Sequence, residues 1–130
     1  MDVIGVIPAR YSSTRFEGKV LADILGKPMI QHIWERAKQA KALDDLLIAC
    51  DDERVLVACS EFGAKVILTA KGHISGTDRI IEVINPLDVK VVVNIQGDEP
   101  LIHPVMIDMA AQALLEDKSV SMATIMKQIE

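Results

Sequence analysis

Three cationic residues lie close together in the sequence near the amino end of the chain, and their types and spacing are typical of a segment that binds phosphate groups. Arg10, Arg15 and Lys19 share a short segment with several small residues, namely Ser12, Ser13, Thr14 and Gly18. Arginine offers a fork for phosphate oxygens, lysine a compact charge, and glycine allows the backbone to approach an anion. The segment therefore suits a polyphosphate, with a solvated basic loop as the alternative.

A second polar segment carries residues that could contact a nucleotide base. It consists of Ser75, Gly76, Thr77, Asp78 and Arg79. These residues open an expected helix, whose first N–H groups and small side chains can read a base edge or an anion. The alternative is a simple helix cap.

A third segment places carboxylates directly after an apolar run. Asp98 and Glu99 follow the run that ends near Ile95. A carboxylate there can hold Mg²⁺ against a triphosphate, because Mg²⁺ prefers one or two protein carboxylates together with phosphate oxygens. The alternative is turn chemistry with both carboxylates solvated.

The elements that must position these segments alternate along the chain. We expect strands over residues 3–8, 46–50, 64–68, 90–95 and 121–129, and helices over 28–37, 53–62, 77–84 and 104–116. Alternation of this kind predicts a parallel sheet with right-handed crossovers, helices on both faces and ligands beyond the carboxyl ends of the strands. The polar segment over residues 9–27 is expected to be a long functional loop.

Composition narrows the function further. The chain has 130 residues, 50% apolar and 25% charged, which predicts one globular domain. A net charge of −5 and 3% aromatic residues disfavour a nucleic-acid or anionic-membrane surface. We expect no membrane span and, from Asp2 and Arg10, no signal peptide. Cys50 and Cys59 lack metal-ligand spacing and are predicted to be buried, reduced thiols of a cytoplasmic protein.

Known nucleotide motifs offer a second constraint. Neither the Walker pattern nor a Gly-x-Gly-x-x-Gly pattern follows the first apolar run, which disfavours a kinase of that type or a dinucleotide-dependent dehydrogenase. Taken together, five blocks instead resemble the cytidylyltransferases that activate 3-deoxy-manno-octulosonate (Kdo), also called CMP-Kdo synthetases. The blocks are IPARYSSTRF at 7–16 with Gly18 and Lys19, LGKPMI at 25–30, DDERV at 51–55, SGTDR at 75–79, and VVNIQGDEPLI at 92–102.

The resemblance implies a fold, a reaction and a set of site residues. The fold is a three-layer, Rossmann-like, mostly parallel α/β sheet of the nucleotide-diphospho-sugar transferase type. The reaction is attack of the sugar's anomeric hydroxyl on the α-phosphate of CTP, giving CMP-Kdo for lipopolysaccharide and pyrophosphate. The resemblance implies that the triphosphate is contacted by Ala9, Arg10 and Lys19. It implies that the cytidine side is contacted by Ser75, Gly76, Thr77 and Arg79. It also implies that Gln96 contacts the sugar and that Asp98 binds Mg²⁺. Arg10, Lys19 and Asp98 are the implied catalytic residues, acting by positioning and electrostatics without a covalent nucleophile.

Two departures from the family pattern bear on activity. Glu17 stands where the family usually has proline, which adds a negative charge beside the phosphate segment. Family members also have a carboxyl-terminal half that supplies most sugar contacts, a further metal-binding carboxylate and a dimer interface. We therefore expect residues 1–130 to be a truncated, single nucleotide-binding domain that binds CTP weakly, with the full-length form a homodimer. The alternatives are a cytidylyltransferase for another acidic sugar and a non-catalytic binding module.

Overall fold

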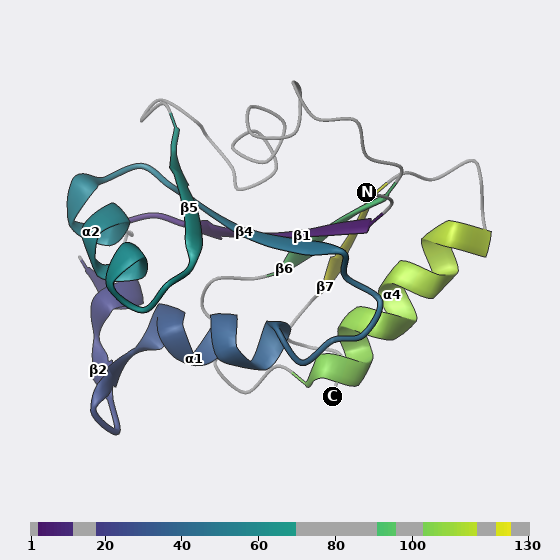
Figure 1. Ribbon diagram of the computed structural model, residues 1–130, viewed down its shortest axis with the longest axis horizontal. Coiled ribbons are helices and arrows are strands. Elements are labelled where there is room, and N and C mark those ends of the chain that lie inside the picture. Colours follow the sequence, from purple (N-terminus) through teal and green to yellow (C-terminus); the bar gives the residue numbers. More distant parts are fainter. Residues whose placement is uncertain (1–2, 12–17, 70–90, 96–102, 117–121, 126–130) are drawn as a thin grey trace.

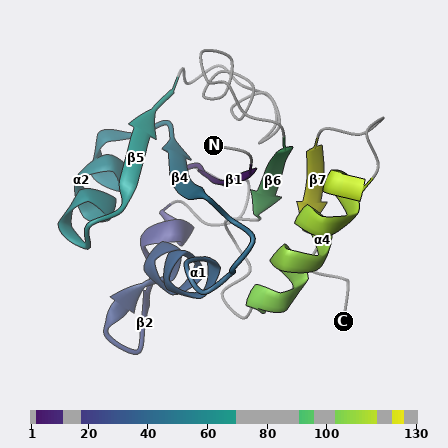
Figure 2. The same ribbon diagram turned by 45° about the vertical axis from the view of Figure 1, so that its right-hand side comes forward.

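A five-stranded parallel sheet forms the centre of the protein. The structure is a computed structural model and describes residues 3–11, 18–69, 91–95, 103–116 and 122–125. The strands are β1 (Val3–Ala9), β4 (Asp45–Cys50), β5 (Lys65–Leu68), β6 (Val91–Ile95) and β7 (Met122–Ile125). They lie in the order β5-β4-β1-β6-β7 (Figure 2), and every neighbouring pair is parallel. The predicted parallel α/β sheet is confirmed.

The central strands are apolar on both sides because the sheet is buried on both faces. In β1, Val3 and Ile7 belong to a core cluster on one face, whereas Ile4 and Val6 belong to a cluster on the other. The first, larger cluster takes in residues of three helices. Such strands show continuous hydrophobic runs instead of alternation, which is how β1, β4 and β6 are recognisable in the sequence.

Three helices pack on one face of this sheet: α1 (Met29–Ala37), α2 (Glu53–Glu61) and α4 (Pro104–Glu116). In α1, the buried residues recur at helical spacing, namely Met29, Ile30, Ile33 and Ala37. The α2 helix starts at Asp52, whose Oδ1 accepts the N–H of Arg54 at 2.8 Å, and its end is followed by Gly63 at φ +88°. These boundaries match the predicted ones within one or two residues.

All three described helices lie on the same face of the sheet. The connections β1-α1-β4 and β6-α4-β7 cross the sheet in opposite directions, yet α1 and α4 lie on the same face (Figure 1). The two crossovers are therefore of opposite hand, and the prediction that all are right-handed is wrong. The physical reason is a shared core, because Ile107 and Ala111 of α4 join the same apolar cluster as Ile33 of α1. The predicted helix over 77–84 lies outside the described residues.

The long segment after β1 contains regular structure that the sequence reasoning missed. A 3-10 turn, η1 (Lys19–Leu21), is followed by a two-stranded hairpin of β2 (Asp23–Ile24) and β3 (Lys27–Pro28). Its tip is made by Leu25 and Gly26, at φ +53° and +87°. Two consecutive positive φ values are what a two-residue hairpin turn requires. The Nε2 atom of His32 lies within hydrogen-bond distance of the Ile24 carbonyl and fixes the hairpin to α1.

Two further expectations concern burial and membranes. Cys50 and Cys59 are free thiols and fully buried, as predicted. Met29 is buried in the core, whereas Met109 is 67% exposed on α4. Within the described ranges, no helix combines the length and the apolarity that crossing a bilayer requires.

Candidate functional site

The direction in which successive strands are added to the sheet reverses between β1 and β6. From β1 the chain moves outward through β4 to β5, whereas β6 and β7 lie on the other side of β1. In open parallel sheets, ligands bind beyond the carboxyl ends of the strands, at the point where the strand order reverses. The candidate site is therefore the edge where β1 and β6 end.

The two strands at this reversal separate before they end. Pairing of β1 with β6 stops at Val6 opposite Asn94, while pairing with β4 continues to Ala9 opposite Cys50. Pro8 lies in the stretch that pairs with β4 alone. Proline cannot donate to a strand ladder and is tolerated where one side of the strand is unpaired. Within the described ranges, no strand pairs with the end of β1 on the side that faces β6.

Three of the predicted site residues lie in the described part of the chain. Ala9 is the buried last residue of β1, and Arg10 directly after it is exposed. Lys19 starts η1 and is partly buried. A hydrogen bond of 2.5 Å from the Gly18 N–H to the Tyr11 carbonyl brings the backbone beside Arg10 and the backbone beside Lys19 together. The other predicted residues, Ser75, Gly76, Thr77, Arg79, Gln96 and Asp98, lie outside the described residues, as does Glu17.

The structure adds residues that the sequence reasoning did not assign to the site. The N–H of Tyr11 donates to Asp51 Oδ1 at 3.1 Å, so the segment after β1 is fixed to the end of β4. The guanidinium carbon of Arg54 lies 3.5 Å from the centre of the Tyr11 ring. Asp51 and Arg54 fall within one of the resembling blocks, but no signal in the sequence pairs them with Tyr11, because that pairing exists only in the folded sheet.

Arg54 is itself fixed in place by the residue that caps α2. Its Nε donates to Asp52 Oδ1 at 2.9 Å and its Nη2 to Asp52 Oδ2 at 2.8 Å. This bidentate arrangement matches the planar guanidinium to the carboxylate. The side chain of Asp52 is only 16% exposed, whereas that of Arg54 is 59% exposed. The capping carboxylate thus also orients the arginine over Tyr11.

The resemblance implies a divalent cation, which needs carboxylate, phosphate or water oxygens as ligands. Among them, no group of three His, Cys, Asp or Glu side chains could hold a metal ion. Asp51 and Asp52 stand at the right edge but already bind the Tyr11 N–H and the Arg54 guanidinium. The described part of the chain therefore holds no complete metal site of its own.

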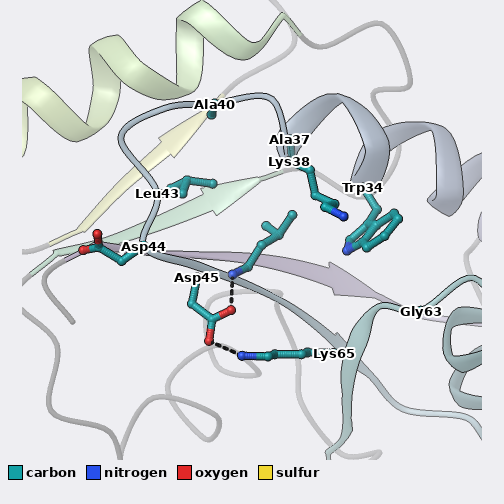
Figure 3. A pocket seen from close by; sticks show the side chains of 10 residues that line it. Trp34, Ala37, Lys38, Ala40, Leu43, Asp44, Asp45, Gly63 and Lys65 are labelled. Atoms are coloured by element: carbon teal, nitrogen blue, oxygen red, sulfur yellow. Dashed lines mark hydrogen bonds and ion pairs between the residues drawn. The ribbon is translucent and has the colours of Figure 1, made fainter.

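A cavity of about 300 Å³ lies at the opposite, amino edge of the sheet (Figure 3). Its walls come from the end of α1 and the starts of β4 and β5. Trp34 packs on Phe62 with ring centres 5.0 Å apart, and Lys38 Nζ lies 4.4 Å from the Trp34 ring centre. Lys65 Nζ is 2.9 Å from Asp45 Oδ2. None of the predicted site residues lines this cavity, so it is not the site that the sequence predicts.

Three of the described ionisable groups have shifted pKa values, and none of them is a predicted site residue. Hydrogen bonds from Lys27 and Gln31 lower the pKa of Glu35. Burial opposes ionisation of Asp45, but hydrogen bonds from Lys65 and from the Leu46 N–H outweigh it and lower its pKa. Burial, with a smaller contribution from Cys50, raises the pKa of Cys59 to about 12. At neutral pH the Cys59 thiol is therefore protonated and a poor nucleophile.

Comparison with known protein families gives a match along nearly the whole chain. The cytidylyltransferase family is matched over residues 4–130. A 3-deoxy-manno-octulosonate cytidylyltransferase of Geotalea uraniireducens is 51% identical over 130 residues, which is 100% of this chain and 52% of that protein. The chain spans about half the length of the curated relatives it matches.

Comparison with solved structures agrees in fold. A CMP:2-keto-3-deoxy-manno-octonic acid synthetase complexed with CTP superposes with a TM-score of 0.88 at 44% identity, over 92% of this chain and 50% of that one. A nucleotidyl transferase from Methanothermobacter has a TM-score of 0.73 at 15% identity, over 85% and 57%, which shows the fold alone. The predicted nucleotidyltransferase type of α/β fold is confirmed, and this chain covers about half of each structure.

Proposed function

The chain belongs to the cytidylyltransferase family, and we propose that it is the nucleotide-binding half of a 3-deoxy-manno-octulosonate cytidylyltransferase. In this proposal the carboxyl edge of the sheet binds CTP. The reaction joins Kdo to the CMP part of CTP and releases pyrophosphate.

One observation carries the proposal. The similarity to relatives named for this reaction extends over the entire chain, including the strand ends where parallel sheets bind ligands. The solved structure that superposes at a TM-score of 0.88 is complexed with CTP. An anion-binding role for this edge also has a local basis, since Arg10 is exposed directly beyond the last residue of β1.

Arg10 and Lys19 are proposed to bind the triphosphate. The anomeric hydroxyl of the sugar gives up its proton to solvent as its oxygen bonds to the α-phosphorus. The bond from that phosphorus to the bridging oxygen breaks, and pyrophosphate leaves with that electron pair. Negative charge grows on the leaving pyrophosphate, and fixed cations stabilise it more than they stabilise the ground state. The closure of the backbone between Tyr11 and Gly18 keeps both cations at the same edge.

Asp98 is proposed to hold Mg²⁺, which would neutralise charge on the phosphate oxygens. In the sequence it follows by three residues the end of β6, the strand beside the strand-order reversal. Ser75, Gly76, Thr77 and Arg79 are proposed cytidine contacts, and Gln96 a sugar contact. Cytoplasmic location, a homodimeric full-length form and a role in lipopolysaccharide synthesis belong to the same proposal.

A calorimetric titration with each of the four nucleoside triphosphates in Mg²⁺ tests the proposal. We expect binding of CTP in preference to the others. Arg10→Ala and Lys19→Ala should each weaken CTP binding about tenfold or more, because each removes a charge-assisted hydrogen bond. Lys65→Ala is the matched control, since it removes a cation from the amino edge. Absence of CTP binding, together with capture of a protein partner, would favour the non-catalytic module instead.

A second experiment separates the possible sugars. Pyrophosphate release is measured with CTP, Mg²⁺ and either Kdo or another acidic sugar, in this chain and in a full-length form. We expect release with Kdo from the full-length form and little from this chain. Asp98→Ala in the full-length form should abolish the Mg²⁺-dependent part of the rate. Faster release with a different acidic sugar would assign that sugar as the substrate.

A further inference from the structure

Tyr11 has an unusual set of neighbours for a residue directly after the proposed phosphate-binding arginine. The Arg54 guanidinium lies 3.5 Å from the ring centre. At Gly18, an added Cβ would lie only 3.2 Å from the ring Cζ and the hydroxyl oxygen. The ring is therefore packed against both Arg54 and the Gly18 backbone, in a space that only glycine leaves open.

The backbone of Tyr11 is fixed as well as its ring. Its N–H donates to Asp51 Oδ1 at 3.1 Å, and its carbonyl accepts from the Gly18 N–H at 2.5 Å. Arg10 precedes Tyr11 and Lys19 follows Gly18 in the sequence. Each proposed phosphate cation is thus the chain neighbour of a residue that this set of contacts immobilises.

We propose that Arg54 is a positioning residue that, by stacking on Tyr11, holds Arg10 and Lys19 in the arrangement that binds the triphosphate. This inference rests on the proposed function. Arg54 suits the role because Asp52 engages its Nε and Nη2 in a bidentate pair and so fixes the plane of the guanidinium. Lysine cannot reproduce a planar, doubly bonded stack. Preorganising a binding loop raises affinity by reducing the ordering required on binding.

The first test measures the stack directly and does not depend on nucleotide binding. Tyr11 is the only tyrosine and Trp34 the only tryptophan of the chain. In a Trp34→Phe background, the tyrosine band of the near-ultraviolet circular dichroism therefore reports on Tyr11 alone. A fixed ring is needed for this signal, so Arg54→Leu should reduce it by about half or more. An unchanged band in folded protein would overturn the proposal.

The second test measures CTP affinity in Mg²⁺ by calorimetry. Arg54→Leu should weaken CTP binding about fivefold, equivalent to about 1 kcal/mol, the scale of an exposed cation–π contact. Lys65→Leu is the matched control, because Lys65 is also an exposed cation paired with an aspartate, at 67% side-chain exposure against 59% for Arg54. It should bind CTP as the wild type does. Equal losses in both variants would indicate only a net-charge effect and would overturn the proposal.

A charge-balanced variant removes the remaining ambiguity, because Arg54→Leu leaves the Asp52 carboxylate without its arginine partner and able to repel CTP. Asp52→Asn/Arg54→Leu removes both charges and keeps a good helix cap. We expect it to remain about fivefold weaker than Asp52→Asn alone, at a similar midpoint of urea unfolding, and we expect Arg54→Lys not to restore affinity. Affinity restored to that of Asp52→Asn would overturn the proposal. A wild-type chain that binds no CTP would instead overturn the proposed function and leave the spectroscopic result standing.

Discussion

The cationic side chains at the two edges of the sheet differ in their exposure and in the groups that they contact. At the amino edge, Lys65 is paired with Asp45 and Lys38 lies over the Trp34 ring. At the carboxyl edge, Arg10 is exposed and forms no ion pair within the described part of the chain, while Arg54 is paired and directed at a ring that fixes the neighbouring backbone. Arg10 is thus accessible to an external anion, whereas the two lysines at the amino edge are engaged by a carboxylate and by an aromatic ring. The comparison favours the carboxyl edge as the functional one.

The largest expected effect comes from the core that both edges share. Ile48 is fully buried in β4, the strand that runs from Asp45 at one edge to Cys50 at the other. Ile48→Ala should lower the free energy of unfolding by about 2–5 kcal/mol, measured by urea denaturation. Val57→Ala is the control, because Val57 is 56% exposed on α2 and should change stability by less than about 0.5 kcal/mol. Equal effects would contradict the assigned core.

Substitutions at two glycines distinguish the stability cost of backbone strain from the cost of a steric contact. Gly18 at the carboxyl edge and Gly63 near the amino edge both have positive φ, +75° and +88°, but only Gly18 has a side chain within 4 Å of an added Cβ. Gly63→Ala should cost about 1 kcal/mol of stability from backbone strain alone. Gly18→Ala should cost more, because its Cβ would press on the Tyr11 ring. It should also weaken CTP binding, whereas Gly63→Ala should leave binding unchanged.

The amino edge should show an acid-dependent contribution to stability. The pKa of Asp45 is lowered on folding from its ordinary value of 3.8, so its contribution is present above that value and is lost as pH falls through the folded pKa. Lys65→Met removes the hydrogen bond that lowers the pKa. It should cost less than about 1 kcal/mol at pH 7, because the pair is partly exposed, and nothing at acid pH. Urea titrations from pH 2 to 7 measure this difference, and a constant loss at all pH values would contradict it.

The smallest expected effect near neutral pH concerns the buried thiols. Folding raises the pKa of Cys59 to about 12, so at pH 8 the native protein should react with iodoacetamide only through unfolding. The rate should rise steeply in urea. The sign of the linkage also predicts that stability falls as pH rises above about 9, where the unfolded thiol ionises and the folded one does not. Fast alkylation of the folded chain would contradict the assigned burial.

The sequence predicted the strands that are buried on both faces and the helix whose two ends carry capping residues. Continuous apolar runs identified β1, β4 and β6, and Asp52 with Gly63 marked the limits of α2 within one or two residues. It did not predict the hairpin tip at Leu25, because leucine rarely adopts a positive φ. It also missed the face occupied by α4, since that depends on which apolar cluster the helix joins. Pairings such as Tyr11 with Arg54 depend on strand order and have no local signal.

The position of β1 has a consequence for how the chain is made. This strand is the middle one of the sheet, and its Val3 pairs with Val91, a residue translated much later. At about 5–20 residues per second on a ribosome, the interval between these two strands is roughly 5–20 s. During that time one edge of β1 lacks the strand with which its backbone N–H and C=O groups pair. Slow, non-local strand pairing of this kind exposes a nascent chain to aggregation, so we expect chaperone binding to concentrate in this interval.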